Sequence, residues 1–403
     1  MQRFMDTPMH GKRTLVEIER QRYRCKACGK TLFEPLPDMD DKRQMTSRLL
    51  AYIEKNSLRK TFSDLAREVG VDDKTIRHVF DDYRERLGAT THFETPRILG
   101  IDELMIIGEY RAMITNIENL SLYDMLPTRK KVDLLEYFKQ LPNKQRVEIV
   151  TMDMWNVYRQ VVRAQLPNRI VVVDRFHVVR MANDALEHMR KAIRKSLDAA
   201  TRRKLKDDRK VLLLRRHSLT ADQQAKLVKW VTLFPSLGAA YALKESFCDI
   251  YGAETRAEAE KAGRIWLKSI PADQAPYFRR TATALNNWWA EIFNYFDYPV
   301  TNAYTESINN IAKGMNRMGR GYSLEVIRAR LLFDDEARGG TKKAIRTKPR
   351  VKAPATRRLP PRLEGLETLE TFAAEESLPP VRYVEFGPSL EILARKLNEG
   401  WFE

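Results

Sequence analysis

The chain has 403 residues, 43% of them hydrophobic, which is enough to bury more than one core and to form two or more domains. Its net charge of +17 and pI of about 9.7 favour a polyanionic partner, because each neutralised phosphate releases condensed counterions. Solvated lysines alone would be the alternative explanation. Transmembrane runs and a secretory leader are not recognisable, so we expect a soluble, cytoplasmic protein without a membrane partner. Three cysteines exclude a disulfide framework.

Residues 1–36 alternate like short strands and end in Cys25 and Cys28, followed by Gly29. This spacing is typical of a zinc-ribbon knuckle, in which glycine lets the chain turn tightly around the metal. One cysteine pair is only half of a tetrahedral Zn²⁺ site, and His10 is the one nearby additional candidate. We therefore expect a zinc-ribbon remnant, with a metal-free remnant as the alternative.

Residues 37–95 favour helices, and the segment 61–79 fits a helix-turn-helix. Ala66 is small where two helices would cross, Gly70 suits a left-handed turn, and Asp72 or Asp73 would cap the second helix. An ordinary helical hairpin is the alternative. The side chains predicted to point outward, towards DNA bases and phosphates, are Lys74, Thr75, Arg77 and His78.

Residues 96–195 alternate between strand and helix patterns. The predicted strands lie near 98–104, 109–117, 120–126, 147–152 and 169–174, with helices near 130–141, near 155–165 and from about 178. A three-strand meander followed by strand–helix units is the order of an RNase H-like mixed sheet. Asp102 and Asp153 end the apolar runs of the first and fourth strands. Functional sites lie at such strand ends in open α/β sheets.

Residues 196–284 read as an all-helical insertion that begins with a charged stretch, and residues 285–340 return to the sheet-containing domain. Tryptophans at helical spacing usually pack in a core, although stacking on a DNA base is a second role for Trp230, Trp266, Trp288 or Trp289. Residues 341–403 read as a basic linker and an acidic tail. The overall prediction is a multidomain α+β and α/β chain.

One helix face in 285–340 carries a row of polar residues at positions i, i+4, i+7 and i+11. The row consists of Asn302, Glu306, Asn309 and Lys313, and Arg317 extends it. Glu306 would join Asp102 and Asp153 in an oxygen cage for two Mg²⁺ or Mn²⁺ ions, which is the arrangement that cuts and joins phosphodiesters. The asparagines, Lys313 and Arg317 would hold DNA nearby. A solvated polar stripe is disfavoured, because asparagine is a poor helix former.

Four runs together resemble motifs of bacterial insertion-sequence transposases of the ISL-three family: Gly100–Glu103, Met152–Tyr158, Val173–His177 and Asn302–Tyr322. The resemblance implies an RNase H-like DDE transposase with the triad Asp102, Asp153 and Glu306. It also implies a zinc ribbon and a helix-turn-helix that bind the terminal inverted repeats of the element. The implied reaction is cleavage and strand transfer, with double-stranded end DNA and target DNA as substrates. The implied protein is a homodimer or a larger homo-oligomer that acts near the nucleoid. The family usually has a second, upstream cysteine pair, which this sequence does not show.

Two alternatives remain open at this level. Asp174 also ends a buried strand and competes with Asp153, and Asp174 with His177 resembles a (C/D)-x-x-H motif whose role is either structural or accessory to the site. The chain as a whole has an alternative function as a transposase-derived helix-turn-helix DNA-binding protein or regulator without catalysis. Loss of a triad acid would mark that alternative, and all three candidates are present.

Overall fold

The computed structural model describes residues 1–319 and 321–334. The predictions for residues 335–340 and for the linker and tail at 341–403 lie outside this described part. No helix within it is long and apolar enough to cross a membrane.

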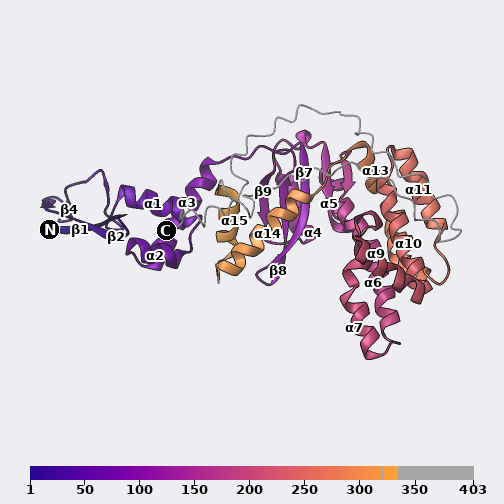
Figure 1. Ribbon diagram of the computed structural model, residues 1–403. Helices are drawn as coiled ribbons and strands as arrows, with labels where there is room; N and C mark the ends of the chain where they lie inside the picture. Colours follow the sequence, from indigo (N-terminus) through magenta and orange to yellow (C-terminus); the bar gives the residue numbers. More distant parts are fainter. Residues whose placement is uncertain (320, 335–403) are drawn as a thin grey trace, which may run out of the picture. The chain divides into compact units, whose positions relative to one another are not determined.

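A five-stranded mixed sheet forms where the apolar runs were found (Figure 1). Its strands are β7 (Ile98–Ile106), β8 (Glu109–Asn116), β9 (Ser121–Leu126), β10 (Ile149–Met152) and β11 (Ile170–Val173). The order is β11-β10-β7-β8-β9, in which β7, β8 and β9 are antiparallel and β10 runs parallel to both β7 and β11. The predicted strands and the mixed sheet are therefore confirmed.

Alternation along β7 sends its side chains to two different cores, because successive residues of a strand point to opposite faces. Leu99 and Ile101 belong to the core that also contains the helices α4 (Lys131–Gln140) and α5 (Asn156–Gln165). Leu104 belongs to the core that contains α14 and α15. Asp102 has the same parity as Leu104, so the strand aims its carboxylate towards the α14 face.

The helices α14 (Ala303–Met318) and α15 (Leu324–Phe333) cover that second face. Figure 1 shows α14 crossing the sheet, and α14 contacts both β7 and β8 while α15 contacts β9. The hydroxyls of Thr115 on β8 and Thr305 on α14 are 2.6 Å apart and buried. Arg328 of α15 pairs with Asp124 of β9 at 2.8 Å. The start of α14 is thus fixed directly over the middle of the sheet.

The helix-turn-helix forms as its caps predicted, from α1 (Ser47–Ser57), α2 (Phe62–Val69) and α3 (Asp73–Thr90). Gly70 ends α2 with φ of +79°, the left-handed conformation that favours glycine. The Asp72 side chain accepts a hydrogen bond from the Thr75 backbone N–H at 2.9 Å and caps α3.

The first residues form two small sheets. β1 (Gln2–Met9) and β2 (Lys12–Ile18) make a hairpin that is extended by β6 (Met45–Thr46) and β5 (Met39–Asp40). β3 (Arg22–Arg24) and β4 (Thr31–Phe33) make a separate hairpin. Residues 39–46 therefore contribute short strands, although we expected helices throughout 37–95. The reason is pairing with β1, since Met5 lies opposite Met45.

Helices follow the sheet. They are α6 (Arg175–Arg194), α7 (Ala199–Asp207), α8 (Arg209–Leu213), α9 (Ala221–Leu233), α10 (Pro235–Asp249), α11 (Arg256–Lys268), α12 (Ala275–Asn287) and α13 (Trp289–Asp297). Trp230, Trp266 and Trp288 are at most 4% exposed and belong to one core with the sheet. That burial favours packing over base stacking for these three tryptophans.

The helix-turn-helix packs against α15 through a buried arginine. The Arg330 guanidinium lies 4.3 Å from the centre of the Tyr322 ring and 5.2 Å from that of Phe62. Its Nη2 donates to the backbone carbonyls of Ser57 and Lys60 at 2.7 and 2.5 Å. Hydrogen bonds from a charged donor contribute about 1.5–3 kcal/mol each, so Arg330 is a principal link between α15 and the end of α1.

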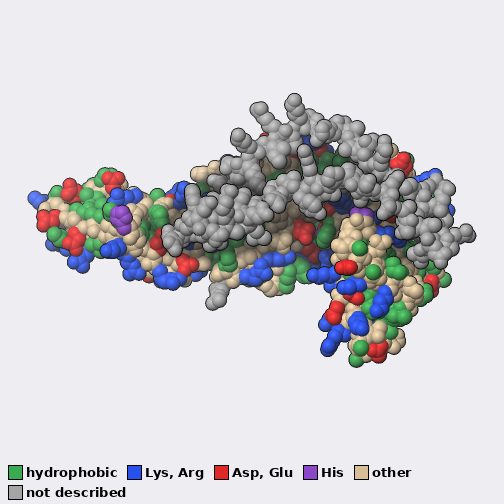
Figure 2. All heavy atoms as spheres, in the orientation of Figure 1, with side chains coloured by type: hydrophobic (Ala, Val, Ile, Leu, Met, Phe, Trp, Pro, Cys, Tyr) green, Lys and Arg blue, Asp and Glu red, His purple; other side chains and the backbone are tan. Residues whose placement is uncertain are grey.

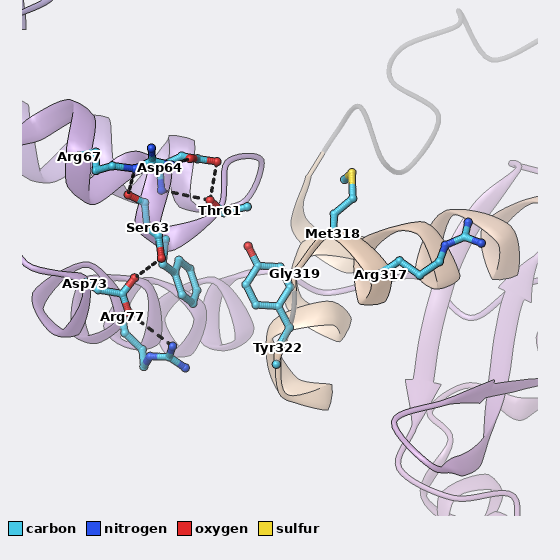
Figure 3. A pocket seen from close by; sticks show the side chains of 12 residues that line it. Thr61, Ser63, Asp64, Arg67, Asp73, Arg77, Arg317, Met318, Gly319 and Tyr322 are labelled. Atoms are coloured by element: carbon cyan, nitrogen blue, oxygen red, sulfur yellow. Dashed lines mark hydrogen bonds and ion pairs between the residues drawn. The ribbon is translucent and has the colours of Figure 1, made fainter.

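A cavity of about 620 Å³ lies beside this contact, lined by α2, α3 and the connection from α14 to α15. In Figure 3, Tyr322 faces the side chains of Ser63 and Arg77, while Arg317 points away from them. The segment that follows α14 therefore lines a cavity together with the helix-turn-helix.

Candidate active site

Three potential metal ligands meet at the sheet: Asp102, Asp153 and His177. Each offers one ligand atom, and these atoms all lie within 4.8 Å of one another. Strand register explains the meeting of the two acids, because Met152 pairs with Ile101 in the parallel β7–β10 ladder. The next residue of each strand is therefore an aspartate, and the two lie side by side. His177 reaches the same place from the first turn of α6.

Asp102 is 7% exposed and is held by two donors. The Glu103 backbone N–H donates to its Oδ1 at 2.7 Å, and Asn309 Nδ2 donates to its Oδ2 at 2.8 Å. Burial, followed by the negative charge of Asp153, raises the pKa of Asp102 to about 7. A carboxylate in this position is an anion without sufficient compensating charge, which is the condition that a cation would relieve.

His177 contacts one of the two acids directly. Its Nε2 lies 3.0 Å from Asp153 Oδ1. Burial lowers the pKa of the imidazole, but the contact with Asp153 and the charges of Asp102 and Asp174 outweigh it and raise the pKa above its ordinary value. The imidazole thus supplies positive character between the carboxylates.

Asp174 has a different position from Asp153. It caps α6 by accepting a hydrogen bond from the Phe176 backbone N–H at 3.3 Å, and burial raises its pKa. It does not belong to the group of three ligands among the described residues. Capping is a structural role, and the contribution of its charge to the site is electrostatic.

Glu306 lies on α14, one turn after Asn302, and is exposed. Its charge is one of those that raise the pKa of Asp102, after those of Asp153 and Asp174. It is not a member of the close group of ligands in the described chain. The structure therefore brings Glu306 to the neighbourhood of Asp102 without closing the predicted cage, and its catalytic role stays a prediction.

The two asparagines of the predicted row face inward. Asn302 Nδ2 donates to the Ile101 carbonyl at 3.0 Å, and Thr305 Oγ1 donates to Asn302 Oδ1 at 2.5 Å. Asn309 is 4% exposed, and its Oδ1 is buried without a hydrogen-bond partner among the described residues. These amides hold α14 against β7, so the DNA contacts expected of them stay predictions. Lys313 and Arg317 are exposed.

The residues predicted for DNA reading lie on the outer side of α3. Lys74, Arg77 and His78 are exposed, and Thr75 is partly exposed. Thr75 Oγ1 donates to Asp72 Oδ2 at 2.6 Å, so its hydroxyl supports the cap. The face is therefore available to a ligand, and its contact with DNA stays a prediction.

Cys25 and Cys28 flank a tight turn between β3 and β4. The Gly29 N–H donates to the Cys25 carbonyl at 3.0 Å, and Gly29 has φ of +67°, as the knuckle pattern requires. Hydrogen bonds from the turn's backbone N–H groups lower the pKa of the Cys25 thiol. Among the described residues, no third ligand joins the pair, so the turn fits half of a zinc site.

Two features of the site were missed from the sequence. The hydrogen bond from Asn309 to Asp102 joins residues more than 200 positions apart. The sequence signal was the helical row itself, which we assigned to DNA. The second feature is Arg129, which ion-pairs with Glu103 next to Asp102. Arg129 belongs to a basic run before α4, and nothing in that run indicates that it lies near the acids.

Comparison with known families identifies the chain. A family described as "Transposase", the DDE domain of the ISL3 transposases, matches residues 99–331. The helix-turn-helix domain of transposase family ISL3 matches residues 34–84, and the zinc-finger of transposase IS204/IS1001/IS1096/IS1165 matches residues 1–28.

Individual relatives agree with these matches. The transposase for insertion sequence element IS1001 of Bordetella parapertussis is 23% identical over 332 residues, which cover 80% of this chain and 81% of the relative. The transposase for insertion sequence element IS1557 of Mycobacterium tuberculosis, in strains CDC 1551 and H37Rv, is 25% identical over 274 residues, 61% of each chain. Since the DDE match alone spans more than half of the 403 residues, the protein belongs to the ISL3 family of DDE transposases.

Proposed function

We propose that the protein binds the terminal inverted repeats of its insertion sequence, cleaves the DNA at these ends and joins them to target DNA in a metal-dependent reaction. The observation that carries the proposal is the meeting of Asp102, Asp153 and His177 within 4.8 Å, where Asp102 lies in the middle of β7 and Asp153 directly follows the adjacent parallel strand β10. Membership of the DDE transposase family supports the same reaction class.

The residues present fit a divalent cation. Asp102 and Asp153 offer hard oxygen ligands of the kind that Mg²⁺ and Mn²⁺ prefer. The pKa of Asp102, raised by burial and by neighbouring acids, and the unpartnered buried Oδ1 of Asn309 both indicate a place where positive charge is needed. We propose that Asp102, Asp153 and Glu306 hold the metal, which would supply charge stabilisation at the attacking and leaving oxygens of the phosphodiester.

The chain's own residues prepare this chemistry in three ways. Asn309 and the Glu103 N–H orient the Asp102 carboxylate. His177 orients Asp153. The contacts of Asn302 with β7 place the first turn of α14, and with it Glu306, beside the acids. Such prior positioning is the main contribution that a protein makes to phosphoryl transfer.

Several surfaces suit a DNA partner. Lysine and arginine side chains gather over α7 (Figure 2), where Arg202, Arg203, Lys204 and Lys206 are exposed. The outer face of α3 carries Lys74, Arg77 and His78. We propose that α3 reads the terminal repeats, that double-stranded end and target DNA are the substrates, and that two or more copies act together, because two ends must be joined. Cys25 and Cys28 would supply two of the four ligands of a zinc site at the amino-terminal turn.

The experiment is a cleavage and strand-transfer assay on duplexes carrying the element's ends, with Mg²⁺ or Mn²⁺. We expect Asp102→Ala, Asp153→Ala and Glu306→Ala to abolish both steps while retaining end binding, and Asp174→Ala to reduce them less. The exposed Glu136 of α4 provides the control, and Glu136→Ala should behave as wild type. Cleavage retained in the Asp102 variant would overturn the proposal. End binding without any cleavage by the wild type would favour the alternative of a non-catalytic regulator.

A further inference from the structure

An arginine lies between two aromatic rings beside the acids. The guanidinium carbon of Arg129 is 3.9 Å from the centre of the Tyr110 ring and 4.6 Å from that of Trp155. Arg129 comes from the connection between β9 and α4, Tyr110 from β8, and Trp155 from the connection between β10 and α5. We call these three residues the arginine clamp. Residues from three separate segments meet in it, so the guanidinium is fixed in place by the fold.

Short contacts join the clamp to the acids. Arg129 ion-pairs with Glu103, the neighbour of Asp102. The Trp155 ring lies 4.7 Å from the Tyr158 ring, edge to face, and the Tyr158 hydroxyl donates to the Asp102 carbonyl at 3.3 Å. Burial raises the pKa of Tyr158, the charges of Asp102 and Asp153 add to this, and the charge of Arg129 opposes it. The guanidinium therefore shares the electrostatic environment of the site.

The guanidinium of the arginine clamp still has N–H groups available to bind a ligand. A guanidinium has five N–H donors, and the ion pair with Glu103 does not saturate them. The Arg129 side chain remains 27% exposed, and the Tyr110 residue is 44% exposed. Aromatic rings on both sides limit the rotamers of the arginine, which reduces the entropy lost when it binds a planar or tetrahedral oxyanion.

A nucleic-acid strand entering the site needs such a group. The site gathers four carboxylates, because Asp153, Asp174 and Glu306 are all close enough to Asp102 for their charges to raise its pKa. A phosphate next to the reacting one meets this negative field without direct compensation. Arginine is the side chain best suited to hold a phosphate through paired N–H donors.

We propose that Arg129, held by Tyr110 and Trp155, binds a non-bridging phosphate oxygen of the DNA strand adjacent to the phosphodiester that is cleaved. This inference rests on the proposed function. It adds a substrate-positioning residue that belongs neither to α3 nor to α7. Its partner is the sugar–phosphate backbone, so the contact is independent of base sequence.

The test is a scan of end-bearing duplexes in which single phosphates around the cleavage position are replaced by neutral methylphosphonates. Binding is measured with Ca²⁺, so that cleavage does not interfere. For wild type we expect one or two adjacent positions to weaken binding on the order of tenfold, as loss of a charged hydrogen bond does. In Arg129→Gln the same substitutions should have no further effect, and the slope of log Kobs against log salt should be less steep by about one.

Arg97→Gln is the matched control. Arg97 immediately precedes β7 and ion-pairs with Glu118 and Glu148, so its loss also removes a positive charge and its ion pairs next to this strand. This variant should keep the wild-type methylphosphonate profile and salt slope. Tyr110→Phe should keep the profile, whereas Tyr110→Ala should weaken it, because the ring and not the hydroxyl restrains the arginine.

A profile in Arg129→Gln identical to that of wild type would overturn the inference, as would a uniform loss at every phosphate position. The assay reads binding and not turnover. A wild type that binds ends without cleaving them would therefore refute the proposed catalysis, while the phosphate contact would still be decided by the profile.

Discussion

The burial of Asp102 makes the stability of the metal-free protein depend on pH in a defined direction. The pKa of Asp102 is raised to about 7 from its ordinary value of 3.8, first by burial and then by Asp153. The folded chain therefore binds more protons at this site than the unfolded chain between these two values. The stabilising contribution is fully present below pH 3.8 and is lost as pH rises through about 7. One pKa unit corresponds to about 1.36 kcal/mol, so the loss is at most about 4 kcal/mol.

The assay is calorimetric unfolding of the full chain in chelator from pH 5 to pH 8, compared between wild type and Asp102→Asn. Only the pH dependence is compared, because the amide also loses an acceptor. Between pH 5 and about pH 7 the loss is about 2.7 kcal/mol, which for a unit of this size corresponds to roughly 5–8 °C in Tm, and the wild-type Tm should fall by more than that of the variant. Mg²⁺ at pH 8 should raise the wild-type Tm and leave the variant almost unchanged. Parallel pH curves for the two proteins would refute the reasoning.

Three further substitutions test the packing beside the acids and in the helix-turn-helix. Gly100→Ala should lower the free energy of unfolding by about 1–3 kcal/mol and reduce cleavage. The reason is that the added Cβ would lie 2.3 Å from Thr115 Oγ1 and 2.7 Å from Asn302 Oδ1. Calorimetry and the cleavage assay measure the two effects. Arg330→Met should cost about 3–5 kcal/mol, since two buried carbonyls lose a charged donor, and unchanged urea unfolding would contradict it. Asp72→Ala should cost about 1 kcal/mol through the lost cap and weaken end binding, as measured by the midpoint of unfolding and by gel shift.

Much of the fold follows from local pattern. Apolar runs of strand length located all five strands of the mixed sheet, because strands that are covered on both faces are nearly continuous in hydrophobicity. Gly70 and Asp72 located the turn and the start of α3, because each is required by a specific backbone geometry. The sequence placed Asp102 and Asp153 together correctly, because β7 and β10 are neighbours in the sheet. It placed Asp102 wrongly at a strand end, since β7 continues to Ile106 by pairing with β8.

Other features depend on contacts between distant segments, and local pattern does not encode these. The inward rotation of Asn309 depends on how α14 sits on β7. The place of His177 within the acid group depends on the angle at which α6 leaves β11. Residues 39–46 form strands because β1 offers them an edge, which helix propensity does not register. The arginine clamp joins one strand and two connections that are far apart in the sequence, and no local pattern indicates that they meet.

Because Arg330 of α15 packs against Tyr322 and against Phe62 of α2, the helix-turn-helix depends on α15 for part of its support. A new DNA-reading head cannot be exchanged at the boundary between residues 95 and 96 alone, since its supporting surface is encoded more than 200 residues later. A working chimera would have to inherit the donor's α15 together with the donor's head. Natural changes of end specificity in this lineage should accordingly leave paired substitutions at both places, a pattern that an alignment of relatives would reveal.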